Sequence, residues 1–165
     1  HHQSTGKILN EIRSGQLDGG YIFGDIPGDF IGITLKKVPI TTVAPLGFEL
    51  STTLTSAQLS QQPWITMGEY CPFDDMLREK LGRDTLSVLK SSEDGTRLAL
   101  VKSGLGLSFL PLEEALLAEK NKLVQIIPTL NFSMPLRFVV AKNRVSEPVT
   151  KALIQDIRIL GQLSS

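Results

Sequence analysis

The sequence predicts an α/β fold in which most of the sheet is parallel. Short apolar runs rich in β-branched residues alternate with amphipathic helical patterns along most of the 165 residues, an order typical of parallel strands joined by helices. Glycine, proline or capping residues mark most boundaries between these runs. The composition, 41% hydrophobic and 21% charged, is that of a globular chain that can bury a core without disulfides.

Helices are predicted from apolar spacing and from residues that start or stop helices. The first runs from a Ser4 or Thr5 cap to about Ser14, and Gly15 ends it. A second helix is expected after Pro72, with Gly82 past its end and with Phe73, Met76, Leu77 and Leu81 buried. A third is expected from Ser91, with Asp94 in the capping-box position and Leu98, Val101 and Leu105 buried, and a short fourth over Leu112–Glu119. The last is expected from Ser146, with Gly161 past its end and with Val149, Leu153, Ile154, Ile157 and Leu160 facing inward.

Strands are predicted where β-branched or aromatic residues cluster between turn signals. Lys36-Lys37 separates two such runs, and the polar stretch 51–62 has room for one helical turn around Ala57–Leu59. The expected strands cover 18–24, 31–35, 38–43, 63–67, 85–90, 105–110, 123–127 and 136–141.

The stretch ALVKSGLGLSFLP, residues 99–111, holds two glycines between a helix and a strand. A nucleotide-binding glycine loop requires the opposite order, a strand followed by a helix. Gly104 is therefore interpreted as the residue past a helix end that needs a positive φ, and Gly106 as a point of close packing.

Charge and cysteine content exclude several classes of protein. Lys+Arg and Asp+Glu number 17 each, which argues against a DNA-binding module in this chain alone. The lone Cys71 suits a reducing compartment. We expect a cytoplasmic protein, because no run is long enough to span a bilayer and the N-terminus has no signal-peptide core.

No catalytic arrangement stands out, so an enzyme is not expected. The only histidines, His1 and His2, are adjacent at the N-terminus and lack a third metal ligand nearby. Glu69, Asp25 and Asp29 have no evident partner for acid–base chemistry. Neither a metal nor a cofactor is expected.

Four segments in order resemble the effector-binding domain of LysR-type transcriptional regulators. The segments are KILNEIRSGQLDGGYIFG, VPITTVAP, SSEDGTRLALVKSGLGLSFLP and LRFVVAKNRVSEPVTKALIQDI, and together they cover nearly the whole chain. The resemblance implies a two-lobed fold of the type II periplasmic-binding-protein kind with two crossing strands. Lobe I would comprise 1–44 plus 140–165, and lobe II would comprise 45–139.

The chain departs from that family in two places. Gly47-Phe48-Glu49-Leu50 stands where the family usually has His-Pro-Leu. The family's domain also opens with a strand, a helix and a second strand that would precede Lys7. We therefore expect an N-terminally truncated fragment whose first lobe is incomplete or is completed by another chain.

The resemblance also implies an effector, most simply a small organic anion, in the cleft between the lobes. Three segments would face it by family position: Gln3, Ser4 and Thr5 at the first helix; Thr66, Met67, Gly68, Glu69, Tyr70 and Cys71 between a strand and a helix; and Phe109. The threonine hydroxyls would bind a carboxylate, and Gly68 would permit close approach. Glu69 would repel an anion, so it would instead read a hydroxyl or cationic group or face solvent. Thr5 also reads as a plain N-cap, and Phe109 as a core residue.

Partners and alternatives follow from the same resemblance. The full-length protein would self-associate as a dimer or tetramer and contact DNA through an absent winged helix-turn-helix domain, with no membrane partner. A fragment of a transport solute-binding protein would share the fold. Cys71, placed before Pro72 at a helix N-terminus, could instead be an oxidation sensor with a depressed pKa. Because no second cysteine is present and free cysteine is usually buried, a small pocket-wall or buried role is favoured.

Overall fold

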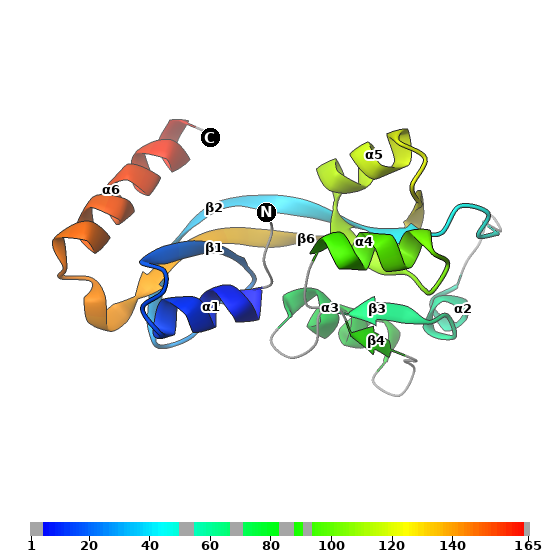
Figure 1. Cartoon of the computed structure of the whole chain (residues 1–165), viewed down its shortest axis with the longest axis horizontal. Coiled ribbons are helices and arrows are strands. Elements are labelled where there is room, and N and C mark those ends of the chain that lie inside the picture. The colour runs from blue at the N-terminus through cyan, green and yellow to red at the C-terminus, as the bar shows by residue number, and fades with distance from the viewer. Residues whose placement is uncertain (1–4, 50–54, 67–70, 83–87, 91–93, 164–165) are drawn as a thin grey trace. The chain divides into compact units, whose positions relative to one another are not determined.

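The two longest strands, β2 (Phe30–Ala44) and β6 (Gln125–Ala141), are neighbours in a four-stranded sheet of order β1-β6-β2-β5 (Figure 1). β1 (Gly19–Phe23) pairs antiparallel with β6, and β5 (Ser108–Pro111) pairs antiparallel with β2. The structure is a computed structural model that describes residues 5–49, 55–66, 71–82, 88–90 and 94–163.

The prediction of a mostly parallel sheet is wrong for these antiparallel pairs and is confirmed for the smaller, two-stranded sheet. There β3 (Trp64–Thr66) and β4 (Val88–Lys90) run parallel, with a helix between them in the chain. Crossover helices produce parallel pairing only when they join neighbouring strands. β1 pairs instead with β6, which lies more than a hundred residues further along the chain.

The two breaks expected in the long strands are absent. Lys36-Lys37 continues β2, and the segment 128–135 joins the two runs that were expected on either side of it. Pro39 is tolerated in β2 because β5 pairs only from Ile40 onward, so fewer ladder hydrogen bonds are required at the proline. In β6, buried Leu130 and Met134 alternate with exposed Asn131 and Ser133, the signature of a strand.

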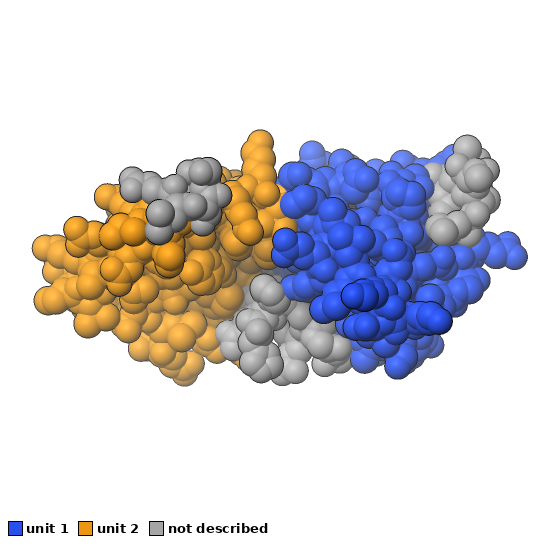
Figure 2. Space-filling view, turned by 90° about the horizontal axis from the view of Figure 1, so that it is seen from above, with its two compact units in different colours: residues 1–3, 39–133 blue, residues 4–38, 134–165 orange. Residues whose placement is uncertain are grey.

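The chain divides into two compact units, coloured separately in Figure 2. Unit 1 comprises residues 1–3 and 39–133, and unit 2 comprises residues 4–38 and 134–165. Both long strands therefore contribute one end to each unit. Each unit has its own hydrophobic core.

Unit 1 packs its helices around a core that includes Val43, Ile65, Val101 and Leu110. Most of the helix predictions hold here, because local residues set the ends. Thr55 and Gln58 form a reciprocal capping box around the short helix that was expected near Ala57. The helices are α2 (Ser56–Ser60), α3 (Pro72–Leu81), α4 (Asp94–Lys102) and α5 (Leu112–Lys120).

The glycine joint of unit 1 is confirmed. Gly104 follows α4 with φ +85°, and Gly106 has no room for a side chain, since a Cβ there would lie 2.7 Å from the Pro63 carbonyl oxygen. Leu105, expected to be buried, is half exposed because the chain turns away after Gly104. The predicted cap at Ser91 lies outside the described residues.

In unit 2, α1 (Thr5–Arg13) and α6 (Pro148–Leu163) cover opposite faces of the sheet. Val139 packs in the cluster that contains Leu9 and Ile12 of α1, whereas its neighbours Phe138 and Val140 pack against Ile157 of α6. Alternation along β6 therefore serves both helices. Gly15 ends α1 with φ +82°, as predicted.

The inward face of α6 is shorter than predicted. Val149 and Leu160 are more than half exposed, and the buried contacts concentrate on Ile157 with the partly buried Leu153 and Ile154. Gly161 lies inside the helix rather than past its end. A glycine within a helix costs only about 1 kcal/mol, so it does not by itself end one.

Candidate functional site

The structure describes four of the ten residues that sequence analysis assigned to effector binding. These are Thr5 in unit 2 and Thr66, Cys71 and Phe109 in unit 1. The other six, namely Gln3, Ser4, Met67, Gly68, Glu69 and Tyr70, lie outside the described residues.

Thr5 is the first residue of α1, and its hydroxyl oxygen accepts a hydrogen bond from the Phe23 backbone N–H at 3.2 Å. The hydroxyl thereby ties the start of the helix to the end of β1. Because a hydroxyl can accept and donate at once, its proton is still available for a second acceptor. The residue therefore has a structural role that is compatible with ligand contact.

Thr66 ends β3 in a buried position, with only 3% of its surface exposed. Its strand pairs with β4 through Lys90. Six residues later Pro72 begins α3, whose first turn carries Asp74 and Asp75. The connection predicted to face the effector therefore begins at the end of a paired strand, β3, and ends at the start of a helix, α3.

Phe109 belongs to a chain of aromatic rings inside unit 1. Its ring centroid lies 5.2 Å from that of Trp64 and 5.0 Å from that of Phe132, and Phe132 in turn lies 6.3 Å from Phe73. Both contacts of Phe132 are edge-to-face, and the Trp64–Phe109 pair is tilted. Aromatic pairs of these kinds stabilise a core beyond the area that they bury. The neighbouring Ser108 donates its hydroxyl to the Ile65 carbonyl at 3.0 Å.

Cys71 does not have the environment of an oxidation sensor. Burial raises the pKa of its thiol to about 12, and the Asp74 carboxylate adds to that effect while the Arg97 guanidinium opposes it. The thiolate is the reactive form of cysteine, so this thiol, which stays protonated at neutral pH, reacts slowly with oxidants. The alternative of a depressed pKa at Cys71 is therefore wrong: desolvation outweighs the helix terminus.

Arg97 in α4 is a feature of this region that sequence analysis missed. Only 3% of its surface is exposed, and its guanidinium carbon lies 5.9 Å from the centroid of the Phe73 ring. A buried arginine is rare unless its charge is compensated. The signal in the sequence was an arginine four residues before Val101, on the face of the helix that is otherwise apolar.

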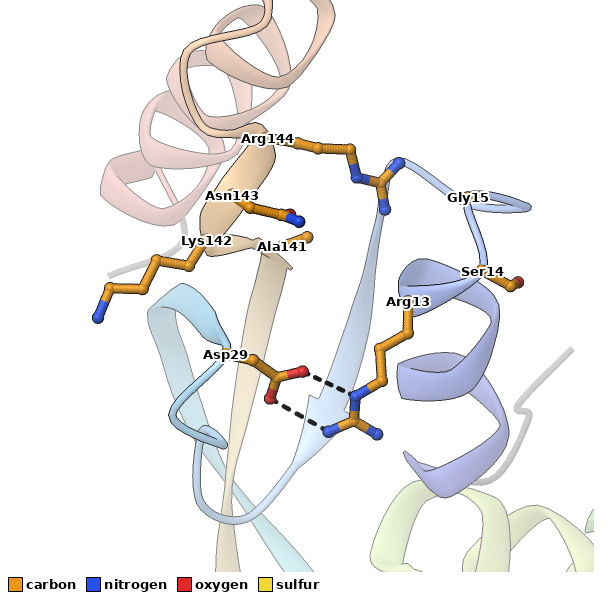
Figure 3. Close-up of a pocket in the computed structure, with 8 residues that line it drawn as sticks. All are labelled: Arg13, Ser14, Gly15, Asp29, Ala141, Lys142, Asn143 and Arg144. Carbon is orange, nitrogen blue, oxygen red and sulfur yellow. Dashed lines mark hydrogen bonds and ion pairs between the residues drawn. The ribbon is translucent and has the colours of Figure 1, made fainter.

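A hollow of about 580 Å³ lies in unit 2, at the C-terminal end of α1 (Figure 3). Three segments line it: the end of α1 with the turn that follows, the residue before β2, and the end of β6 with the short 3-10 helix η1 (Lys142–Arg144). No site was predicted there from the sequence. The lining residues are Arg13, Ser14, Gly15, Asp29, Ala141, Lys142, Asn143 and Arg144.

Two arginines give this hollow its chemistry. Arg13 donates from Nε and Nη2 to the two carboxylate oxygens of Asp29, at 2.8 and 3.2 Å. This contact lowers the pKa of Asp29, which therefore stays a carboxylate and is a poor general base. Arg144 donates from Nη2 to the carbonyl oxygen of Ile12 and so caps the end of α1.

Two further features follow from the described residues. They contain no group of three or more His, Cys, Asp or Glu side chains placed to hold a metal ion. Within the same residues, no helix combines the length and the apolar character required to cross a membrane.

Solved structures share this fold at low sequence identity. ArgP from Mycobacterium tuberculosis matches with a TM-score of 0.70 at 20% identity, over 94% of this chain and 55% of that one. The C206S mutant of the OxyR2 regulatory domain from Vibrio vulnificus matches with a TM-score of 0.73 at 16% identity, over 97% and 78%. The effector-binding domain of QuiR in complex with shikimate gives 0.70 at 16% identity, over 93% and 75%.

No curated protein was found to match the sequence. The chain spans little more than half of the length of ArgP, so it corresponds to one part of that protein. The model of the LysR substrate binding domain matches residues 1–159, nearly the full length of the sequence. The fold is accordingly that of the type II periplasmic-binding proteins, and the chain belongs to the LysR substrate-binding domain family.

Proposed function

We propose that this chain senses a small organic anion as the effector-binding part of a LysR-type transcriptional regulator. The observation that carries the proposal is the family match over residues 1–159. The fold shared with the QuiR domain, which was solved with shikimate, supports a small-molecule ligand. The ligand of this chain is set by its own side chains, because a fold alone does not fix function.

In unit 2, Thr5 is the side chain proposed to contact the effector. Its oxygen accepts a hydrogen bond from the Phe23 N–H, which restricts the directions in which the hydroxyl proton can point. A pre-positioned donor loses little freedom on binding, so its hydrogen bond contributes more of its energy to affinity.

In unit 1, Thr66 and Arg97 are the proposed contacts. Both are buried, and the charge of Arg97 reaches Cys71, at the start of α3. A guanidinium in such low-polarity surroundings attracts a carboxylate far more strongly than one in water. Thr66 would add a hydroxyl donor, and the aromatic rings around Phe109 would supply an apolar wall.

We further propose that effector binding is transmitted by a population shift. An effector that contacts residues of both units favours whichever arrangement lets both sets of contacts form. In the full-length regulator, a dimer or tetramer would pass this preference to the DNA-binding domain.

A thermal-shift screen with the substitution Thr66→Val tests the proposal. The panel contains small carboxylates, amino acids and aromatic acids. A ligand present at 100 times its dissociation constant adds about 2.7 kcal/mol to the free energy of unfolding. Loss of a hydrogen bond to a charged group weakens binding by about 10- to 100-fold, so Thr66→Val should remove about half of the shift or more.

Thr150→Val provides the matched control, because Thr150 is a buried threonine in α6 of unit 2. It should leave the ligand-induced shift intact. Equal loss of the shift in both variants would contradict a direct contact at Thr66. A cooperative transition that no compound moves would contradict an effector of this class.

A further inference from the structure

The hollow of unit 2 has a surplus of positive charge. Three of its lining residues are basic, namely Arg13, Lys142 and Arg144, and Asp29 is the one acidic lining residue. Unit 2 as a whole carries nine Lys and Arg against six Asp and Glu, although the complete chain is neutral. Positive charge is thus concentrated in the unit that contains the hollow.

The single carboxylate is held in a way that reduces its repulsion of a second anion. Both oxygens of Asp29 accept hydrogen bonds from Arg13, and the Asp29 backbone carbonyl accepts one from the Lys142 N–H at 2.9 Å. Bidentate pairing of this kind neutralises a carboxylate locally. The charge that the Arg13–Asp29 pair leaves uncompensated is that of Lys142 and Arg144.

Arg144 is the side chain best placed to bind an anion. Figure 3 shows its guanidinium reaching toward the Gly15 turn, with Asn143 beside it, whereas Lys142 points away from the hollow. Its Nη2 is engaged by Ile12, which fixes the plane of the guanidinium. The Nη1 atom of Arg144 lies 4.0 Å from the point that a Cβ on Gly15 would occupy. Because glycine has no side chain, position 15 does not cover the Nη1 side of the guanidinium.

We propose that this hollow binds a tetrahedral oxyanion, with the Arg144 guanidinium as its main donor. Asn143 would add an amide donor, and Arg13 and Lys142 would add longer-range attraction. The volume of about 580 Å³ leaves room beyond the anion. The same chemistry therefore fits a free sulfate or phosphate ion and the phosphate group of a small ester.

The proposed oxyanion site is separate from the proposed effector contact at Thr5. Thr5 starts α1 and Arg13 ends it, so roughly 12 Å of helix separates the two at 1.5 Å per residue. All of the lining residues belong to unit 2. The inference does not depend on the proposed function.

The test is a titration of the isotopically labelled chain, followed by amide NMR shifts. Sodium sulfate is added at constant ionic strength against sodium chloride. We expect saturable shifts centred on the amides of Gly15 and Asn143. Arg144→Gln should weaken binding about tenfold. Asp29→Asn should strengthen it about threefold, since it removes one nearby negative charge in water-like surroundings.

Lys151→Gln is the matched control, because it removes an exposed positive charge from α6 of the same unit without touching the hollow. Its affinity for sulfate should equal that of the parent chain. Glycerol phosphate forms the second arm of the titration. Tighter binding of the ester than of sulfate would identify a phosphorylated small molecule as the ligand, and equal binding would identify the free ion.

Three results would overturn the proposal. The first is a set of shifts that do not saturate and spread over the chain, as a general salt effect produces. The second is equal affinity in the Arg144→Gln and Lys151→Gln variants. The third is unchanged or weaker binding of sulfate by the Asp29→Asn variant. This result decides the question if Arg144→Gln fails to fold because α1 loses its cap.

Discussion

Two arginines of this protein make the same contact in opposite surroundings. Arg97 in unit 1 lies over Phe73 at 5.9 Å, and Arg13 in unit 2 lies over Phe30 at 5.0 Å. Arg97 is 3% exposed, whereas 45% of the Arg13 side chain is exposed. The two arginine–phenylalanine contacts have similar geometry, but burial determines how much each arginine contributes to the free energy of unfolding.

The difference extends to the groups around them. Arg97 shares its surroundings with Asp74, which is itself buried, and both charges act on the Cys71 thiol. Arg13 pairs with Asp29, whose side chain is half exposed, so water screens the interaction. Water thus screens the Arg97 charge only weakly, whereas it screens the Arg13 charge strongly.

The largest effect on stability is expected from Arg97→Met. Methionine retains a long apolar side chain but removes the buried positive charge that acts, together with that of buried Asp74, on the Cys71 thiol. Breaking a buried arrangement of charges costs about 3 kcal/mol or more. Urea unfolding measures the loss. Arg13→Met serves as the control, and equal losses in the two variants would contradict the comparison.

Cys71 reports on the same surroundings through its reactivity. With a pKa raised to about 12 by burial, the thiol should react with iodoacetamide at pH 8 at least about 100-fold more slowly than an exposed cysteine. Since the Arg97 charge lowers this pKa, Arg97→Met should slow the reaction further. Full reactivity should return in urea. Reaction of the folded chain at the rate of a free thiol would refute the assignment.

The smallest effect is expected from Arg13→Gln. An exposed pair contributes little, so the melting temperature should fall by less than about 3 °C at neutral pH. The pKa of Asp29 is lowered in the folded state, so the contribution is present above its ordinary value of 3.8 and disappears as the pH falls through the lowered value. Melting curves of both proteins from pH 7 to 3 test this, and a difference that grows on acidification would contradict it.

Salt sharpens the contrast further. In 1 M sodium chloride the Arg13→Gln difference should vanish, since the screening length is then about 3 Å. The Arg97→Met difference should persist, because screening by salt is weak for buried charges.

Local features of this chain could be predicted from its sequence, and distant ones could not. Gly15 and Gly104 end helices because each supplies a positive φ at one position, which neighbouring residues suffice to indicate. The unbroken β2 was missed because Pro39 is acceptable only where pairing is incomplete, and that depends on where β5 begins. Antiparallel pairing of β1 with β6 is likewise a property of distant residues.

The sites follow the same rule. Thr5 and Thr66 were selected because family position marks them, each lies at the end of a regular element, and their contact with an effector stays a prediction. The hollow at Arg144 was missed because its lining comes from three separated segments. Arg97 was missed because burial of a charged residue cannot be read from apolar spacing alone.

The division of the chain also has a consequence for the order in which the protein folds during synthesis. Residues 39–133 of unit 1 are continuous and are enclosed in the chain by the two parts of unit 2. A ribosome therefore completes them before β1 can meet its partner, since Gly19 pairs with Val140, 121 residues later. Pairing across such a separation is slow, and domains generally fold as units when they emerge. Unit 1 should thus fold first. Until β6 has been synthesised, the apolar residues of α1 and β1 should stay exposed to water or bound to a chaperone.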